Sequence, residues 1–326
     1  MKIKSCLLIF TFFLIAGTIS GQEKYAIVIH GGAGVMSKSA MNEERQEAYK
    51  IKLNEALNLG QKLLKKGNTA TDVVVQVIEV LENSPLFNAG KGAVFTHDGI
   101  NELDASIMEG KTLNAGAVAG VRNVKNPIKA AREVMENSAH VLLSGEGASE
   151  FAKEQGLEIV KNKYFFTESR YQSLKRLQKR ERERTEKDNA GTVGCAVLDT
   201  YGNICAGTST GGMTNKKYGR IGDSPVIGAG TYANNKTCAV SCTGHGEYYI
   251  RLGFARDISA LMEYQNMSVE EACAEEIRKL GELGGTGGVI GIDAEGNVAM
   301  EFNTSGMFRG YITSSGKKEI AIFEKE

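Results

Sequence analysis

Short apolar runs and amphipathic segments alternate along most of the chain. The runs at 25–29 and 192–198 are short and continuous, which is typical of buried strands. Between them, residues 42–66 place apolar side chains on one helical face and end before Gly67, which predicts a long helix. Residues 71–83 are apolar on nearly every side, so this second helix is expected to lie between layers.

The later segments divide in the same way. Strands are expected at 102–108, 115–121, 140–143, 204–208, 237–242, 289–292 and 298–302, and a turn over 85–95 is expected to feed another strand. Helices are expected at 126–137, with Asn126 as N-cap, and at 147–155, 248–264 and 269–281, the last with Ser268 and Glu271 as a capping box. Helical layers on both sides of sheets predict an α/β (α+β) chain folded as a four-layer αββα sandwich.

The first 21 residues have the pattern of a signal peptide. Two lysines precede an apolar run from Cys6 to Ala16 that is too short to span a bilayer, and small residues follow up to Gly21. No later apolar run is long enough for a transmembrane helix. We therefore expect an exported protein, periplasmic or secreted, with no membrane association after the signal is removed.

The net charge and the cysteine spacing give no support to nucleic-acid binding or to a cysteine-bound metal site. The 39 basic and 39 acidic residues cancel, which gives no reason to expect a nucleic-acid partner. Five cysteines follow the signal segment, with no CxxC pair and no histidine at metal-ligand spacing, so small buried residues are expected. A change of composition marks residues 161–191, where acids and bases interleave between Arg170 and Asp188. This segment is interpreted as a solvated helix or a mobile charged linker.

Seven short motifs stand out, each of them weak alone. They are His30-Gly31-Gly32-Ala33-Gly34, Asn88-Ala89-Gly90, Gly191-Thr192-Val193-Gly194, Thr208-Ser209-Thr210-Gly211-Gly212, Gly219-Arg220-Ile221-Gly222-Asp223-Ser224-Pro225, Thr243-Gly244-His245-Gly246-Glu247 and Asn303-Thr304-Ser305-Gly306-Met307. Together, in this order over essentially the whole mature chain, they resemble the plant-type (type 2) L-asparaginase and isoaspartyl peptidase family of N-terminal nucleophile (Ntn) hydrolases.

The resemblance implies self-cleavage at Gly191-Thr192 into an α subunit, 22–191, and a β subunit, 192–326. These would form one structural domain and assemble as a dimer of αβ units. The implied reaction is hydrolysis of L-asparagine to L-aspartate and ammonia, and of β-aspartyl (isoaspartyl) dipeptides to aspartate and an amino acid, through a β-aspartyl-Thr192 acyl-enzyme.

The chemistry of Thr192 agrees with this implication. A threonine hydroxyl is a poor nucleophile, and one solution is to make threonine the first residue, so that its own α-amine is the base. Such an amine titrates near pH 8. Gly191 lacks a Cβ, which leaves its carbonyl open to attack. Taken alone, Thr192 is better interpreted as an ordinary first residue of a strand, because threonine favours strands.

The substrate would be held by opposite charges. Arg220 and Asp223, three residues apart on one loop, can hold an α-carboxylate and an α-ammonium, although a plain loop ion pair is the alternative. The resemblance assigns oxyanion stabilisation to the Thr243 hydroxyl and the Gly244 N–H.

Other roles also come from the resemblance. Thr210 would orient Thr192 or relay its proton, and Asn88 would be a polar neighbour of the nucleophile. His245 and Gly246 would line the substrate pocket, whereas His30 is interpreted as a packed loop residue. No cofactor is expected for catalysis. A structural sodium ion is implied on the backbone carbonyls of Leu81, Glu82, Ser84, Phe87, Ala89 and Lys91.

Three alternatives remain to be tested. Gly207-Thr208-Ser209-Thr210-Gly211 fits the G-x-S-x-G pattern of an α/β-hydrolase esterase, but glycines follow where that fold needs a helix. Glycosylasparaginase belongs to the same family, and the lack of tryptophan disfavours it. A secreted, non-catalytic binding protein on the same fold would not be cut at Gly191, or would be cut and show no hydrolysis.

Overall fold

The computed structural model describes residues 24–34, 41–182 and 191–324. The expected signal segment and the end of the charged segment, 183–190, lie outside these residues. The elements are β1 Ala26–Gly34, α1 Glu43–Leu64, α2 Ala70–Glu82, the 3₁₀ turn η1 Gly90–Gly92, β2 Leu103–Glu109, β3 Ala115–Val121, α3 Pro127–Asn137, β4 Leu142–Ser144, α4 Gly145–Glu154, the 3₁₀ turn η2 Asn162–Phe165, α5 Glu168–Arg182, β5 Val193–Leu198, β6 Ile204–Thr210, β7 Thr231–Ala233, β8 Cys238–Gly244, α6 Gly246–Leu252, α7 Phe254–Gln265, α8 Val269–Glu282, β9 Gly287–Asp293, β10 Val298–Phe302, β11 Gly306–Thr313 and β12 Lys318–Phe323.

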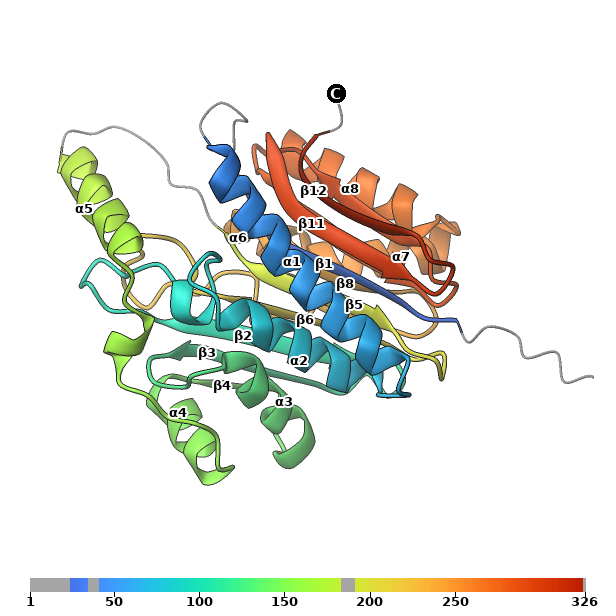
Figure 1. Cartoon of the computed structure of the whole chain (residues 1–326), viewed down its shortest axis with the longest axis horizontal. Helices are drawn as coiled ribbons and strands as arrows, with labels where there is room; N and C mark the ends of the chain where they lie inside the picture. The colour runs from blue at the N-terminus through green and yellow to red at the C-terminus, as the bar shows by residue number, and fades with distance from the viewer. Residues whose placement is uncertain (1–23, 35–40, 183–190, 325–326) are drawn as a thin grey trace, which may run out of the picture.

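Two sheets lie between two helical layers, which confirms the four-layer αββα sandwich (Figure 1). The larger sheet has the order β12-β11-β1-β5-β6-β2-β3-β4 and the smaller has the order β10-β9-β8-β7. Three apolar clusters fill the interfaces: helices α1 to α3 against the larger sheet, sheet against sheet, and the smaller sheet against α7 and α8. Strand β1 shows the alternation, since Ile27 and Ile29 face the helices while Ala26 and Val28 face the other sheet.

Local sequence explains where the helices begin and end. The Asn42 side chain accepts a hydrogen bond from Arg45 N at the start of α1, and Ser268 with Glu271 forms the expected capping box of α8. The single helix expected over 248–264 is instead two, α6 and α7, because Gly253 adopts a left-handed conformation (φ +60°) between them. None of the helices in the described part of the chain is long and apolar enough to cross a membrane.

Several segments differ from the expectation. Residues 30–34 belong to strand β1 and are not a loop, because they pair with β11 beyond an irregularity between His30 and Gly32. The turn over 85–95 feeds no strand; it contains η1, and Phe95 only forms a bridge with Asn101. Asn126 precedes α3 as expected, but its side chain donates to Glu82 and does not cap the helix. Strands β7, β11 and β12 were not expected.

The charged segment expected over 161–191 is helical in its described part. Helix α5 packs by the buried Leu174 and by Tyr171, whose ring contacts Phe95. The Arg170 guanidinium donates to the carbonyl oxygens of Gly92 and Leu86. These contacts attach α5 to the loop that follows α2, so this part of the segment is an ordered helix. The five cysteines after the signal segment are all buried and free, as expected.

Candidate active site

Thr192 and Thr210 form the centre of the site. Thr192 directly precedes β5 and Thr210 ends β6, two neighbouring strands in the middle of the larger sheet. The Thr192 hydroxyl donates to Thr210 Oγ1 at 3.1 Å, and the Thr210 hydroxyl donates to the carbonyl oxygen of Gly191 at 3.1 Å. Gly212 N donates to Thr210 Oγ1 at 3.0 Å. Thr210 therefore connects the candidate nucleophile to the peptide bond that precedes it.

Asn88 provides a second donor to the same carbonyl. Its Nδ2 lies 2.7 Å from Gly191 O and 2.7 Å from Gly212 O, while its Oδ1 accepts from Val94 N at 2.9 Å. The Gly191 carbonyl oxygen thus accepts from one amide and one hydroxyl, both on buried side chains. Donors placed in advance at a carbonyl oxygen stabilise the negative charge that develops when the carbonyl is attacked.

His30 holds the other side of Thr192. Its Nδ1 lies 3.1 Å from Thr192 O, and since a carbonyl oxygen only accepts, Nδ1 carries the proton. Nε2 then accepts from the Ser241 hydroxyl at 3.0 Å, on the facing sheet. Complete burial lowers the pKa of His30 to about 3, against the hydrogen bond to Thr192, so the ring is neutral. His30 is packed as expected but lies in strand β1 and not in a loop, and sequence reasoning missed its contact with Thr192.

Strand β1 also connects Thr192 to Thr243. A Cβ on Gly32 (φ +109°) would lie 3.2 Å from Thr192 N and 3.1 Å from Gly191 Cα, so only glycine fits at this position. The next residue, Ala33, donates its N–H to Thr243 Oγ1 at 3.3 Å. Because the Thr243 hydroxyl accepts from Ala33, its own proton is free to be donated to another acceptor.

The expected substrate residues converge on the start of α6. A Cβ on Gly246 would lie 2.7 Å from Asp223 Oδ1 and 3.0 Å from Arg220 Nη2, so both side chains face this glycine. Gly244 has φ +154° at the end of β8, where a Cβ would meet Thr286 O at 2.5 Å. His245, between the two glycines, is half-buried.

Arg220 pairs with Glu247 and not with Asp223. Arg220 Nε and Nη2 each lie 2.9 Å from an oxygen of the Glu247 carboxylate. The plain loop ion pair between Arg220 and Asp223 considered above is therefore wrong, and Glu247 was missed because it belongs to another element. Asp223 is buried with no hydrogen-bond partner for its Oδ2. Burial raises the pKa of Asp223 to about 7, while the nearby Arg220 acts in the opposite direction.

The esterase alternative fails on geometry. Ser209 lies within β6, adjacent to Thr210 and therefore on the opposite face of the sheet. Its hydroxyl donates to Glu82 Oε1 at 2.7 Å, and the next element along the chain is strand β7, not a helix. A nucleophile elbow requires a strand, a sharp turn and a helix, and the described residues 211–230 contain no helix.

The carbonyls assigned to sodium by resemblance lie in the turn that carries Asn88. A Cβ on Gly90 would lie 2.4 Å from Glu82 O, and one on Gly92 would lie 2.0 Å from Phe87 O. The carbonyls of Leu81 and Ala89 accept hydrogen bonds from Ser84 N and Gly92 N, which leaves each oxygen a second lone pair. Main-chain oxygens are therefore packed closely against the glycines of this turn, and the residues present fit a hard monovalent cation.

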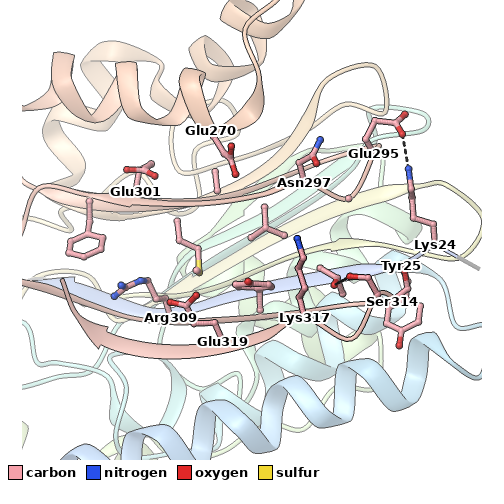
Figure 2. Close-up of a pocket in the computed structure, with 18 of the residues that line it drawn as sticks. Lys24, Tyr25, Glu270, Glu295, Asn297, Glu301, Arg309, Ser314, Lys317 and Glu319 are labelled. Carbon is pink, nitrogen blue, oxygen red and sulfur yellow. Dashed lines mark hydrogen bonds and ion pairs between the residues drawn. The ribbon is translucent and has the colours of Figure 1, made fainter. Parts of the chain in front are cut away.

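Two large cavities differ in their relation to these residues. A cavity of about 830 Å³ extends from Gly219, Arg220 and Ile221 to Glu102 and Arg122. Another, of about 840 Å³, opens between β10 and β11, where Glu270 and Glu301 face Arg309 and Glu319 (Figure 2). The second cavity is lined by none of the site residues expected from the sequence. The first offers open space beside Arg220.

Comparison with known proteins adds independent information. A family model described as Asparaginase matches residues 23–322. The chain is 51% identical over 299 residues to the isoaspartyl peptidase of Escherichia coli (strain K12), which covers 88% of this chain and 92% of that protein. It is 44% identical over 327 residues to the probable isoaspartyl peptidase/L-asparaginase 2 of Arabidopsis thaliana, with 92% and 99% covered. It is 40% identical over 290 residues to the isoaspartyl peptidase/L-asparaginase of Bos taurus, with 86% and 91% covered.

Proposed function

The chain belongs to the asparaginase family, and we propose that it is a threonine hydrolase whose nucleophile, Thr192, is released by a cut at Gly191-Thr192. It is an enzyme that hydrolyses L-asparagine and isoaspartyl dipeptides, the activities in the names of relatives 40–51% identical to it. The observation that supports Thr192 as nucleophile is the hydrogen-bond chain from its hydroxyl through Thr210 to the Gly191 carbonyl.

The cut would use this chain of contacts. The Thr192 hydroxyl oxygen attacks the Gly191 carbonyl carbon, and the resulting oxyanion is stabilised by the donors on Asn88 and Thr210. The C–N bond breaks and the nitrogen takes the proton that the Thr192 hydroxyl has given up, which leaves Gly191 esterified to Thr192. Water then hydrolyses the ester and frees both the Gly191 carboxylate and the Thr192 amine.

The same hydroxyl then serves the substrate. The free α-amine of Thr192 removes the hydroxyl proton, and the oxygen attacks the β-carbonyl of the aspartyl group. The Thr243 hydroxyl and the Gly244 N–H stabilise the oxyanion. The protonated amine returns its proton to the leaving nitrogen, so that ammonia or an amino acid leaves, and water then releases L-aspartate from the acyl-enzyme and restores the Thr192 hydroxyl.

Charge complementarity fixes the substrate in this orientation. An α-carboxylate would displace Glu247 from the Arg220 guanidinium and receive two hydrogen bonds. The α-ammonium would give the buried Asp223 oxygen its missing partner. His245 and Gly246 would line the pocket at the start of α6.

We propose four further properties on the resemblance. Residues 22–191 and 192–326 form the α and β subunits, and two αβ units assemble as a dimer. The protein is exported after removal of residues 1–21. A sodium ion bound by the carbonyls of Leu81, Glu82, Ser84, Phe87, Ala89 and Lys91 would hold the turn that carries Asn88.

Intact mass measurement, with N-terminal sequencing of each fragment and an assay for aspartate release, tests the proposal. We expect two fragments, the smaller beginning Thr-Val-Gly-Cys, and aspartate from both asparagine and a β-aspartyl dipeptide. One uncut, inactive chain would instead support the non-catalytic binding protein. Cleavage with activity only on an asparagine-linked sugar would support glycosylasparaginase.

A further inference from the structure

Lys216 and Asp104 form a buried pair of opposite charges next to Thr210. Lys216 Nζ lies 4.0 Å from Asp104 Oδ2, and each side chain is only 1% exposed. The same Nζ lies 3.9 Å from Glu102 Oε2 and donates to Glu102 O at 3.3 Å. Asp104 Oδ1 accepts from Gly120 N at 2.7 Å, whereas its Oδ2 has no hydrogen-bond partner. Neither step of the proposed reaction uses this pair.

The pair flanks Thr210 on two sides. Asp104 on β2 is the direct cross-strand neighbour of Thr210 on β6, so their side chains lie on the same face of the sheet. Lys216 lies against Gly212, where a Cβ would be 3.1 Å from Nζ. The N–H of Gly212 is the donor to Thr210 Oγ1. Asp104 is therefore on the strand next to Thr210, and Lys216 lies against the residue that donates a hydrogen bond to the Thr210 hydroxyl, the group that contacts Thr192.

Stability alone does not explain the pair. Burying two charges costs several kcal/mol per ion, and their attraction repays this only with good geometry and full hydrogen bonding. Here Lys216 Nζ is 4.0 Å from Asp104 Oδ2, and that carboxylate oxygen has no hydrogen-bond partner. Burial raises the pKa of Asp104, and Lys216 is the main opposing influence.

We propose that Lys216 and Asp104 are positioning residues. Their charges beside Thr210 set the pH at which the Thr192 amine loses its proton and can act as the base. The inference rests on the proposed function, because it requires a free Thr192 amine. A nearby cation disfavours the ammonium form and lowers the amine pKa, while a nearby carboxylate raises it. The two residues therefore act on the amine in opposite directions.

Other charged groups lie around the pair, and one of them also titrates near neutral pH: the pKa of Asp223, about 7, is raised mainly by burial and in part by Asp104. Glu102, which directly precedes β2, is paired with Arg122 at 2.8 Å, and Arg220 interacts electrostatically with Asp104. His30, on the other side of Thr192, is neutral. Asp104→Asn keeps an oxygen for Gly120 N and leaves Glu102 beside Lys216, so it removes one charge with little change of shape.

The experiment measures kcat for asparagine against pH with fully cleaved enzyme at saturating substrate, because this profile reports the enzyme–substrate complex, in which Asp223 is already paired with the α-ammonium. We expect the acidic limb to move down in Asp104→Asn and up in Lys216→Met, each by about 0.5–1 pH unit. The double variant, which removes both charges, should return towards the wild-type limb. Lys125→Met removes a cation from an exposed pair with Glu158 and should leave the limb in place.

Each outcome decides the proposal. Opposite shifts support it, whereas an unmoved acidic limb in Asp104→Asn overturns it, even if kcat falls at every pH, because such a fall reflects structure alone. If one of the two single variants does not fold, the acidic limb of the other is compared with that of the double variant, and an equal position of the two limbs overturns the proposal. An uncut and inactive wild-type enzyme would overturn the proposed function itself, so the two failures are distinguishable.

Discussion

The side-chain amide of Asn88 lies 2.7 Å from the carbonyl oxygen of Gly191, across 103 residues of sequence. An amide at this distance stabilises an oxyanion that forms at Gly191. Asn88→Ala should therefore slow the conversion of one chain into two by roughly 10²-fold, the typical effect of losing one oxyanion donor. Densitometry of the uncut chain over time measures this rate. Asn137→Ala, on the surface end of α3, should convert at the wild-type rate, and an equal rate in Asn88→Ala would exclude this role for the amide.

Thr192→Ala should remain one chain and be inactive, because it lacks the oxygen that we propose attacks both carbonyls. Thr192→Ser keeps a hydroxyl and should still be cut and retain some activity. Intact mass and aspartate release report both properties. A cut after Gly191 in the Thr192→Ala variant would contradict self-cleavage by the hydroxyl at this position.

Arg220→Ala should be cut normally but bind substrate poorly. Two charge-assisted hydrogen bonds to the α-carboxylate would be lost, each worth about 1.5–3 kcal/mol, so kcat/KM should fall by roughly 10²-fold or more. Steady-state kinetics with asparagine measures the effect. Arg278→Ala removes an exposed arginine of α8 and serves as the matched control. Unchanged kinetics in Arg220→Ala would remove the anchoring role.

Glu82 should make stability depend on pH. It is fully buried and accepts hydrogen bonds from Ser209, Ile128 and Asn126, yet burial raises its pKa from 4.5 to about 7. The folded protein therefore holds this proton more tightly than the unfolded chain does. The resulting stability is present below pH 4.5 and is lost as the pH rises through 7, about 3 kcal/mol in all.

Glu82→Gln cannot titrate at this position. The difference in thermal stability, wild type minus Glu82→Gln, should therefore decrease from pH 5 to pH 8.5. The exposed Glu44→Gln provides the control, with a constant difference from wild type. A constant difference for Glu82→Gln would show that Glu82 has the same pKa in the folded and unfolded chains.

Sodium should raise the melting temperature through the turn that carries Asn88. A ligand that binds only the folded state stabilises it by mass action. We expect a higher melting temperature in sodium chloride than in choline chloride at equal ionic strength, measured by thermal unfolding. Equal melting temperatures would count against a bound sodium ion.

Sequence patterns predicted the layered fold better than its details. The apolar runs of β1 and β5 and the amphipathic α1 determine the order of the layers, and each pattern is local. Strands β11 and β12 mix charged, glycine and apolar residues, and they form because β11 pairs with β1. The turn at Gly253 depends on a left-handed backbone that a helical pattern does not reveal.

The candidate site shows the same limit. Motifs identified Thr192, Thr210 and Asn88, which the structure brings together around the Gly191 carbonyl. The residues that these motif residues contact could not be predicted from the sequence. His30 contacts Thr192 across 162 residues and Glu247 contacts Arg220 across 27, and both contacts follow from the register of distant elements, which no local pattern contains.

Strand order in the larger sheet determines how the protein would unfold and refold after a cut at Gly191. Strand β1 lies between β11 and β5, and β6 lies beside β2, so segments from before and after the cut alternate across one sheet. Neither fragment contains the whole of the larger sheet, although the smaller sheet belongs entirely to residues 192–326, so the two fragments would stay together without the peptide bond. Refolding after denaturation would then require two separate molecules to meet and interleave. A cut enzyme should therefore unfold irreversibly, and its lifetime would depend on the barrier to unfolding and not on an equilibrium.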